Sequence, residues 1–180
     1  MRQIFAIFLF SLLPMAAHAE SNIWLLVDTQ SQSLFVNQGE KTLEVLENIA
    51  IGKNGAGFKQ HIGDSITPLG DYKIGWIDTN SAYHLFMGIT YPSEANAWKA
   101  LKQGLISNEH YEAIAAASLH DRVPPQNTPL GGRIGIHGLG RADINIHKKM
   151  NWTKGCIALT NQQIMRLSHW VTEGTVIKIR

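Results

Sequence analysis

Short apolar runs with the character of β-strands recur along the chain, separated by polar turns. Two of them, residues 23–28 and 33–37, flank a polar, turn-like segment and predict a β-hairpin. Apolar residues from Leu43 to Ile51 predict a third strand, with alternation up to Val45. The same pattern predicts further strands at residues 71–78, 83–89, 133–137 and 175–180. The chain is therefore expected to be mostly β.

Helical signals are confined to two regions. Ser93 and Ser107 are suitable N-caps for two consecutive helices that form a helical hairpin over residues 93–119, which is inserted between strands. Thr160, with a glutamine three residues later, has the sequence of a capping box and predicts a helix over residues 161–172. We expect a mostly β (α+β) domain with an inserted helical hairpin and one late helix.

Two loop signals complete the pattern. Residues 52–63 are rich in Gly, Lys and Gln and predict a mobile loop. The tetrapeptide Thr-Pro-Leu-Gly occurs at 67–70 and again at 128–131, and each copy predicts a turn leading into a strand. The residues around the two copies do not repeat, so we do not expect a domain duplication.

Length and charge set the class of protein. A chain of 180 residues predicts one domain, and a net charge of +2 without a basic cluster argues against a nucleic-acid partner.

The N-terminus has the pattern of a secretory signal peptide over 1–19, with Arg2, an apolar stretch at 4–15 and Ala17-His18-Ala19. The alternative, an uncleaved anchor, is disfavoured because the stretch is too short to span a bilayer. We expect export, and a mature chain of residues 20–180 with no membrane span.

Cys156 is the single cysteine of this chain. Most lone cysteines are small buried hydrophobes, and this alternative stands for the motif taken alone. In an oxidising compartment structural cysteines occur in pairs, so an unpaired one is more readily explained as a reactive thiol. Gly155 precedes it, and the two successive amides of Gly155 and Cys156 can point at one oxygen, as in an oxyanion hole.

A cysteine nucleophile needs a base, and His137 is the best candidate. It ends the predicted strand 133–137, and the backbone carbonyl of Gly138 can fix its ring. The alternative is a packed histidine at a strand end. His147 is a reserve candidate in a polar segment, 141–149, that is expected to be a flexible lid. The other mature-chain histidines are expected to be surface or capping residues, with two inside helices: His61, His84, His110, His120 and His169.

No metal site is predicted, because Cys156, His137 and His147 match no common zinc spacing.

The combination of these motifs resembles the L,D-transpeptidase catalytic domain, the YkuD-type fold of bacterial cell-wall enzymes. The resemblance is carried by Ile136-His137-Gly138, by Thr153-x-Gly155-Cys156-Ile157 and by the Thr-Pro-x-Gly sequence at 67–70, and it covers about residues 22–180. It implies a β-sandwich or barrel-like domain that needs no cofactor and acts in the periplasm or cell envelope, in cell-wall biogenesis and cell shape.

The resemblance also implies a mechanism. Cys156 would attack the carbonyl of the third residue of a peptidoglycan stem tetrapeptide and release D-alanine, forming a thioester. His137 would take the thiol proton, the carbonyl of Gly138 would orient its ring, and the amides of Gly155 and Cys156 would hold the oxyanion. The acceptor stays open: another stem peptide, a lipoprotein lysine, a free D-amino acid, or water, which would make the enzyme an L,D-carboxypeptidase or amidase.

Two positions depart from the family pattern. Lys154 stands where the family often has histidine, and Ala158 stands where it often has arginine, which puts recognition of the substrate carboxylate in doubt. Arg133 or Arg141 is expected to compensate, and Thr153 to brace the loop. The inserted hairpin is expected to shape the donor or acceptor cleft. The competing hypotheses are a sortase-like transpeptidase, whose motif lacks the Gly-Cys pair, and a non-catalytic cell-wall binding module.

Overall fold

The protein is described by a computed structural model that covers residues 23–180. The predicted signal peptide, its cleavage site and the first three residues of the expected mature chain lie outside these described residues. Within them, no helix combines the length and the apolar character needed to cross a membrane.

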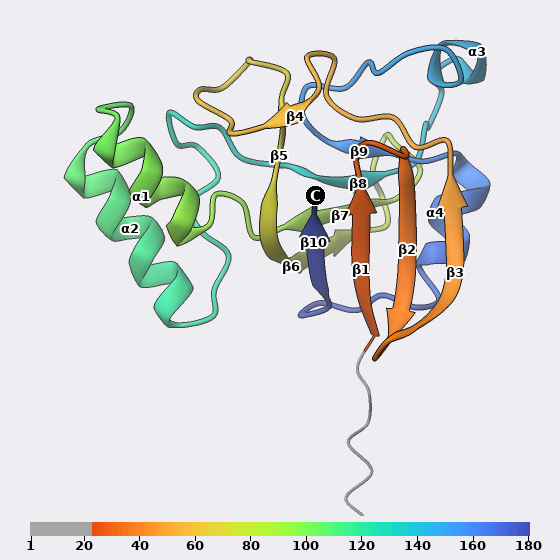
Figure 1. The fold of residues 1–180 in the computed structure, drawn as a ribbon, viewed down its shortest axis with the longest axis horizontal. Coiled ribbons are helices and arrows are strands. Elements are labelled where there is room, and N and C mark those ends of the chain that lie inside the picture. Colours follow the sequence, from red (N-terminus) through yellow and green to blue (C-terminus); the bar gives the residue numbers. More distant parts are fainter. Residues whose placement is uncertain (1–22) are drawn as a thin grey trace, which may run out of the picture.

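A single mixed sheet of eight strands forms the body of the domain (Figure 1). Its spatial order is β3-β2-β1-β10-β6-β7-β8-β9. β10 lies between β1 and β6, parallel to the first and antiparallel to the second. The strands are β1 (Ile23–Asp28), β2 (Ser33–Gln38), β3 (Lys41–Glu47), β6 (Gly70–Asp78), β7 (Phe86–Ile89), β8 (Gly135–His137), β9 (Ile157–Ala158) and β10 (Val176–Ile179).

The two ends of this sheet meet. Ala50, just after β3, exchanges both backbone hydrogen bonds with Ala158 of β9, at 3.0 and 2.7 Å. The strands alternate between the core and the other face as the sequence pattern predicts: Leu25 and Val27 of β1 and Leu34 and Val36 of β2 are fully buried. The sheet thus curls around a core, which confirms the predicted mostly β, barrel-like class.

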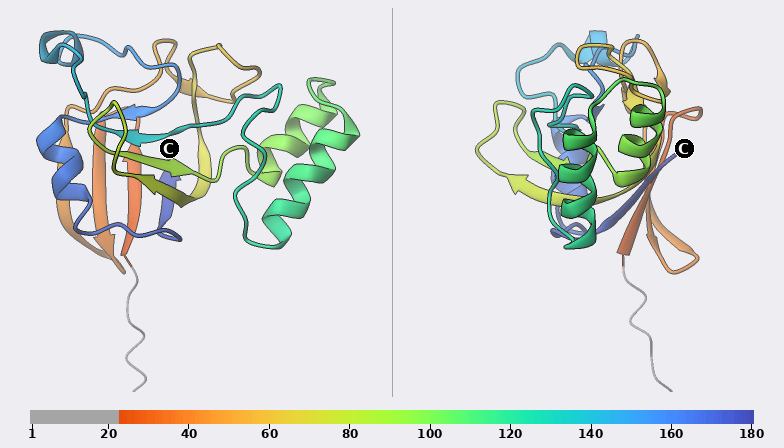
Figure 2. Two further views of the ribbon diagram at one scale, coloured as in Figure 1. Left: turned by 180° about the vertical axis from the view of Figure 1, so that it is seen from behind. Right: turned by 90° about the vertical axis from the view of Figure 1, so that its left-hand side faces the viewer.

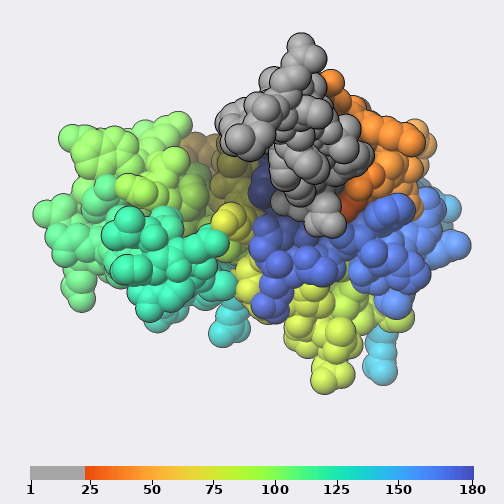
Figure 3. Space-filling model, turned by 90° about the horizontal axis from the view of Figure 1, so that it is seen from below, coloured from red at the N-terminus to blue at the C-terminus, as the bar shows by residue number. Residues whose placement is uncertain are grey.

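The predicted helical hairpin is present. α1 (Glu94–Lys102) begins at a capping box on Ser93, and α2 (Asn108–Leu119) begins at Ser107. The pair forms a lobe beside the sheet, seen in two directions in Figure 2 and as a separate mass in Figure 3. The predicted capping box of Thr160 also exists and opens α4 (Asn161–Leu167).

Several predicted boundaries are wrong for local reasons. The third strand ends at Glu47, because Asn48 takes a positive φ of 58° and breaks the extended run before Ile51. β7 starts at Phe86 rather than at residue 83, because His84 has a φ of 75°. α4 stops at Leu167 rather than 172, with Ser168 as its C-cap, so His169 is not helical.

The two Thr-Pro-Leu-Gly segments differ, contrary to the prediction. Residues 128–131 form a turn, closed by a 2.8 Å bond from the Gly131 N–H to the Thr128 carbonyl. Residues 67–70 do not form such a turn: β5 (Thr67–Pro68) pairs in parallel with β4 (Ala56–Gly57). Identical sequences diverge because only the first copy has a neighbouring extended segment to pair with.

Two segments predicted to be free of structure are tied to the body. The loop at 52–63 contains β4 and buries Lys59, whose ammonium pairs with Asp64. The polar segment at 141–149 contains a short helix, α3 (Ile144–His147), capped by Asp143. His147, at its end, is 4% exposed. Buried polar groups therefore hold segments whose composition predicted mobility.

Candidate active site

One cavity of about 1100 Å³ collects most of the residues that the sequence singled out. Cys156, His137, Thr153, Lys154 and Arg133 all line it. Its remaining walls come from β6, β7 and the loops that follow β6, α2 and α3, and they are Trp76, Asp78, Ser81, Tyr83, Phe86, Val123, Gln126 and Trp152. Among the cavities of residues 23–180, this one brings together a thiol and an imidazole.

The register of β8 and β9 places the thiol and the imidazole on the same side of the sheet. The two strands are parallel, and His137 lies directly opposite Ala158. Cys156 precedes Ala158 by two residues, and side chains two apart along an extended chain point to the same face. The two groups therefore approach the same cavity from neighbouring strands.

Gly155 is required by the geometry of the loop before the nucleophile. Its φ is +124°, and a Cβ added there would lie 2.7 Å from the carbonyl oxygen of Ile66. Thr153 braces the same loop, because its hydroxyl donates to the Cys156 carbonyl at 2.6 Å and accepts the Gly155 N–H at 3.1 Å. In this arrangement the Gly155 amide is engaged, so an oxyanion hole built from both amides requires Thr153 to release it.

The sulfur itself is held by the backbone of the segment before β8. Cys156 Sγ donates to the Arg133 carbonyl at 3.6 Å. Arg133 has a positive φ of 53°, which is why β8 starts at Gly135 and not at residue 133 as predicted. Gln126 fixes this backbone by accepting the Arg133 N–H at 2.6 Å. The carbonyl that contacts the thiol is therefore positioned by a side chain from the preceding loop.

His137 is buried, with 3% of its surface exposed. Its Nδ1 lies 2.7 Å from the Gly138 carbonyl oxygen. A carbonyl only accepts, so Nδ1 carries the proton and Nε2 of the neutral ring is left as the acceptor. The rings of Tyr83, Phe86 and Trp152 surround the imidazole, with centroids 4.4, 6.2 and 6.0 Å away.

Burial keeps both groups neutral in the free protein. It raises the pKa of Cys156 to about 11, against a hydrogen bond from the Gly135 backbone and the charge of Lys59, which lower it. Burial likewise lowers the pKa of His137, against the hydrogen bond to Gly138, which raises it. Within the described residues no hydrogen bond joins Sγ to the imidazole. These pKa shifts favour a thiol and a neutral base over an ion pair.

Two residues that the sequence proposed lie away from this cavity. Arg141 is exposed and does not line it. His147 lines a separate, smaller cavity beside Lys148 and Gln163, and its Nδ1 accepts the Trp152 indole N–H at 3.4 Å. Over residues 23–180 no cluster of three or more His, Cys, Asp or Glu side chains could hold a metal ion.

Sequence reasoning missed the aromatic wall around His137 and the role of Gln126. Trp152 is adjacent to the motif and was the one available signal. Tyr83 and Phe86 reach the site only through the pairing of β7 with β8. Gln126 gives no local sign that it fixes the Arg133 backbone.

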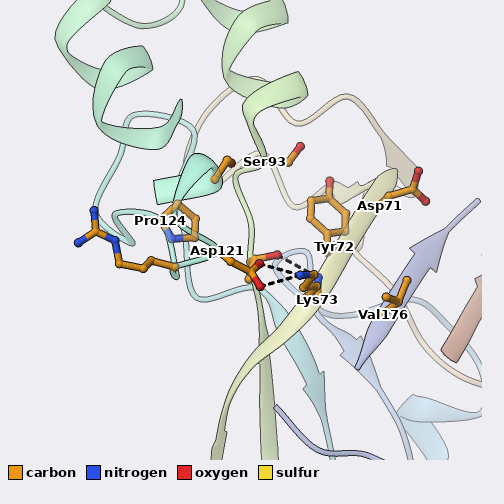
Figure 4. Close-up of a pocket in the computed structure, with 10 residues that line it drawn as sticks. Asp71, Tyr72, Lys73, Ser93, Asp121, Pro124 and Val176 are labelled. Atoms are coloured by element: carbon orange, nitrogen blue, oxygen red, sulfur yellow. Dashed lines mark hydrogen bonds and ion pairs between the residues drawn. The ribbon is translucent and has the colours of Figure 1, made fainter. Parts of the chain in front are cut away.

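A second cavity, of about 280 Å³, lies where the hairpin meets the sheet (Figure 4). Lys73 of β6 and Asp121, just after α2, form an ion pair across it, with Oδ1 at 2.7 Å. Tyr72 lines it too, and its hydroxyl donates to Asn96 of α1 at 3.0 Å. It contains no cysteine or histidine, and these contacts join the lobe to the sheet.

A scan against protein families matches residues 22–179 to the model described as YkuD, L,D-transpeptidase catalytic domain. No curated protein matches the chain.

Solved structures with the same fold are only distantly similar in sequence. Pgp2, the helical cell shape determining protein of Campylobacter jejuni, has a TM-score of 0.59 at 20% identity over 90% of this chain and 48% of its own. Bd1075 of Bdellovibrio bacteriovorus has a TM-score of 0.53 at 17% identity, over 92% of this chain and 49% of its own. An Enterococcus faecium L,D-transpeptidase has a TM-score of 0.50 at 14% identity, over 88% and 50%. The chain thus spans about half the length of these proteins.

Proposed function

Because this chain belongs to the YkuD family of L,D-transpeptidase catalytic domains, we propose that it is an exported peptidoglycan L,D-transpeptidase with Cys156 as its nucleophile. The observation that carries the proposal is the pairing of β8 with β9, by which a thiol and a buried, oriented imidazole share one cavity. The size of that cavity, about 1100 Å³, suits a peptide substrate.

The first half of the proposed reaction forms a thioester. His137 Nε2 takes the proton of Sγ as the sulfur bonds to the carbonyl carbon of the third residue of a stem tetrapeptide. The bond from that carbon to the nitrogen of D-alanine then breaks, and the imidazolium returns the proton to the leaving amine. A proton relay from a neutral pair fits a thiol whose pKa is raised to about 11.

The second half transfers the acyl group. An acceptor amine attacks the thioester and gives its proton to His137, and the carbon–sulfur bond breaks to return the thiol. The acceptor is a second stem peptide, giving a 3→3 cross-link, a lipoprotein lysine or a D-amino acid. Water in the same place makes the reaction an L,D-carboxypeptidase or amidase reaction. By analogy with Pgp2, described as a cell shape determining protein, we extend the proposal to shaping of the cell wall in the periplasm.

Two side chains are proposed to contact the substrate, and a third is proposed to act through the loop before Cys156. Arg133 and Lys154 line the cavity and carry positive charge for a stem-peptide carboxylate. Thr153 is proposed to act through the loop that it braces. Ala158 is fully buried between His137 and Ala50, so the position that often holds arginine in the family contributes no charge here.

The test is mass spectrometry of purified protein mixed with tetrapeptide muropeptides. We expect release of D-alanine with new 3→3 dimers, and no products with Cys156→Ala. Tripeptides without dimers would indicate that water, not an amine, attacks the same thioester, so that the reaction is hydrolysis. Unchanged tetrapeptides under conditions where Cys156 is reduced would overturn the proposal and favour a binding module.

A further inference from the structure

Lys59 and Asp64 form an ion pair inside the protein. Their side chains are 2% and 7% exposed. The carboxylate also accepts the backbone N–H groups of Gln60 at 2.8 Å and Ile66 at 3.1 Å. Removing two charges from water carries a large desolvation cost, and replacing such a pair by apolar residues is often neutral or stabilising. A buried pair of this kind is therefore poorly explained by stability alone.

The pair is packed against both backbone segments that hold the nucleophile. On one side, a Cβ added to Gly131 would lie 3.4 Å from Lys59 Cε, and Gly131 is two residues before Arg133, whose carbonyl contacts Sγ. On the other side, Ile66 donates its N–H to Asp64, and its carbonyl oxygen would lie 2.7 Å from a Cβ added to Gly155. The ion pair thus supports the two backbone segments that adjoin Cys156.

The two charges face different neighbours. The positive charge of Lys59 lowers the pKa of Cys156, whereas the carboxylate of Asp64 acts on Tyr91 and raises the pKa of its hydroxyl. Of the two charges, the cation is therefore the one that favours the thiolate. A lysine ammonium is a compact point charge, which suits this position better than a planar group that needs two partners.

Other ionisable groups line the cavity that contains Cys156. They are Asp78, Tyr83, Arg133, His137 and Lys154. Within the described residues, Lys59 is the side chain whose charge acts on the pKa of Cys156. Its burial also means that salt does not screen it as it screens the exposed Lys154.

We propose that Lys59 is a positioning residue of the reaction, whose buried ammonium stabilises the sulfur anion as the proton passes to His137, and whose pairing with Asp64 holds the loops on either side of Cys156. The inference rests on the proposed function, with His137 as the base. It gives a catalytic reason for the burial of Lys59, in a segment whose composition predicted only a mobile loop.

Alkylation of the single cysteine measures this effect without any peptidoglycan substrate. The rate of reaction with iodoacetamide follows the thiolate fraction, so its dependence on pH reports the thiol pKa. The variants are Lys59→Met, Asp64→Asn and the double variant. Lys99→Met is the matched control, because Lys99 is exposed and its Nζ lies 4.3 Å from the ring centroid of Phe58, the residue before Lys59 in the sequence. Intact-protein mass gives the rate, and thermal unfolding checks the fold.

In Lys59→Met we expect the thiol pKa to rise by about one unit, with alkylation about tenfold slower at about pH 8. Asp64→Asn removes the opposing charge and is expected to leave the thiol pKa the same or lower it, although it loosens the same loop. Lys99→Met is expected to match the parent protein. The proposal would be overturned if the thiol pKa is unchanged in Lys59→Met, or is raised equally in both single variants. The ion pair would then only stabilise the loops.

The double variant decides the matter if Lys59→Met does not fold, because it leaves no unpaired buried charge. We expect its thiol pKa to stay above that of the parent, and a parent-like value would overturn the proposal. Failure of the proposed function is seen separately: it is the absence of muropeptide products in a parent protein whose thiol responds to Lys59 as expected.

Discussion

Replacement of Gly155 by alanine tests whether the loop before the nucleophile has the shape described. Two costs combine there. A side chain at a φ of +124° adds backbone strain of about 1–3 kcal/mol. The new Cβ would also lie 2.7 Å from the Ile66 carbonyl oxygen and 3.1 Å from Ile134 Cδ1, and overpacking of this kind costs about 1–3 kcal/mol.

Gly174 is a control, because a side chain there is also strained by a positive φ but meets no overlap. Its φ is +89°, and an added Cβ would meet no atom within 4 Å. We expect Gly174→Ala to lower the free energy of unfolding by the strain alone, about 1–3 kcal/mol. Gly155→Ala should lower it by about 1–3 kcal/mol more.

Urea unfolding followed by tryptophan fluorescence measures both variants, and iodoacetamide labelling of Cys156 reports the loop itself. We expect Gly155→Ala to be the less stable variant and to change the labelling rate, whereas Gly174→Ala labels as the parent does. Equal losses of unfolding free energy in the two variants would refute the described packing of Gly155 on Ile66.

Two further outcomes follow from the site. Thr153→Val leaves the Gly155 N–H and the Cys156 carbonyl without the hydroxyl that joins them, and we expect a loss of about 1–3 kcal/mol in the free energy of unfolding. Thr153→Ser retains the hydroxyl and should retain stability. Equal losses in the two variants would contradict the role of these two hydrogen bonds. Burial lowers the pKa values of His137 and His147 below 6.5, so the unfolded chain binds protons first as the pH falls through that value, and the free energy of unfolding should decrease at lower pH. Urea titrations at several pH values measure this decrease, and His137→Gln should make it smaller. A free energy of unfolding that does not change with pH in the parent would count against neutral, buried imidazoles.

Features with a local cause were predictable from the sequence. The capping boxes at Ser93 and Thr160 satisfy helix N–H groups within four residues of themselves, so their signals are complete in the sequence. The first hairpin follows from alternation and a short polar turn. Cys156 and His137 were identified by motif, and the structure brings both to one cavity.

Features that depend on distant partners were not predictable. Nothing near Lys59 indicates burial, because the neighbour that encloses it, the turn at 128–131, lies far along the chain. Thr67–Pro68 becomes a strand because Ala56–Gly57 is extended beside it, whereas its sequence alone favours a turn. Arg133 keeps a positive φ because Gln126 accepts its N–H, a contact with no signature in either residue.

The central place of β10 has a consequence for how the molecule is assembled. Within residues 23–180, its residues 176–179 pair the half of the sheet built from β1–β3 with the half that begins with β6, and the bridges of Ala50 to Ala158 and of Gly52 to Thr153 are further links. These residues come late in the sequence of the domain, so the two halves of the sheet pair only after most of the domain has been made. Residues distant in sequence must then join late, a slow kind of folding step, and the surroundings of the reactive sulfur are complete only after that step.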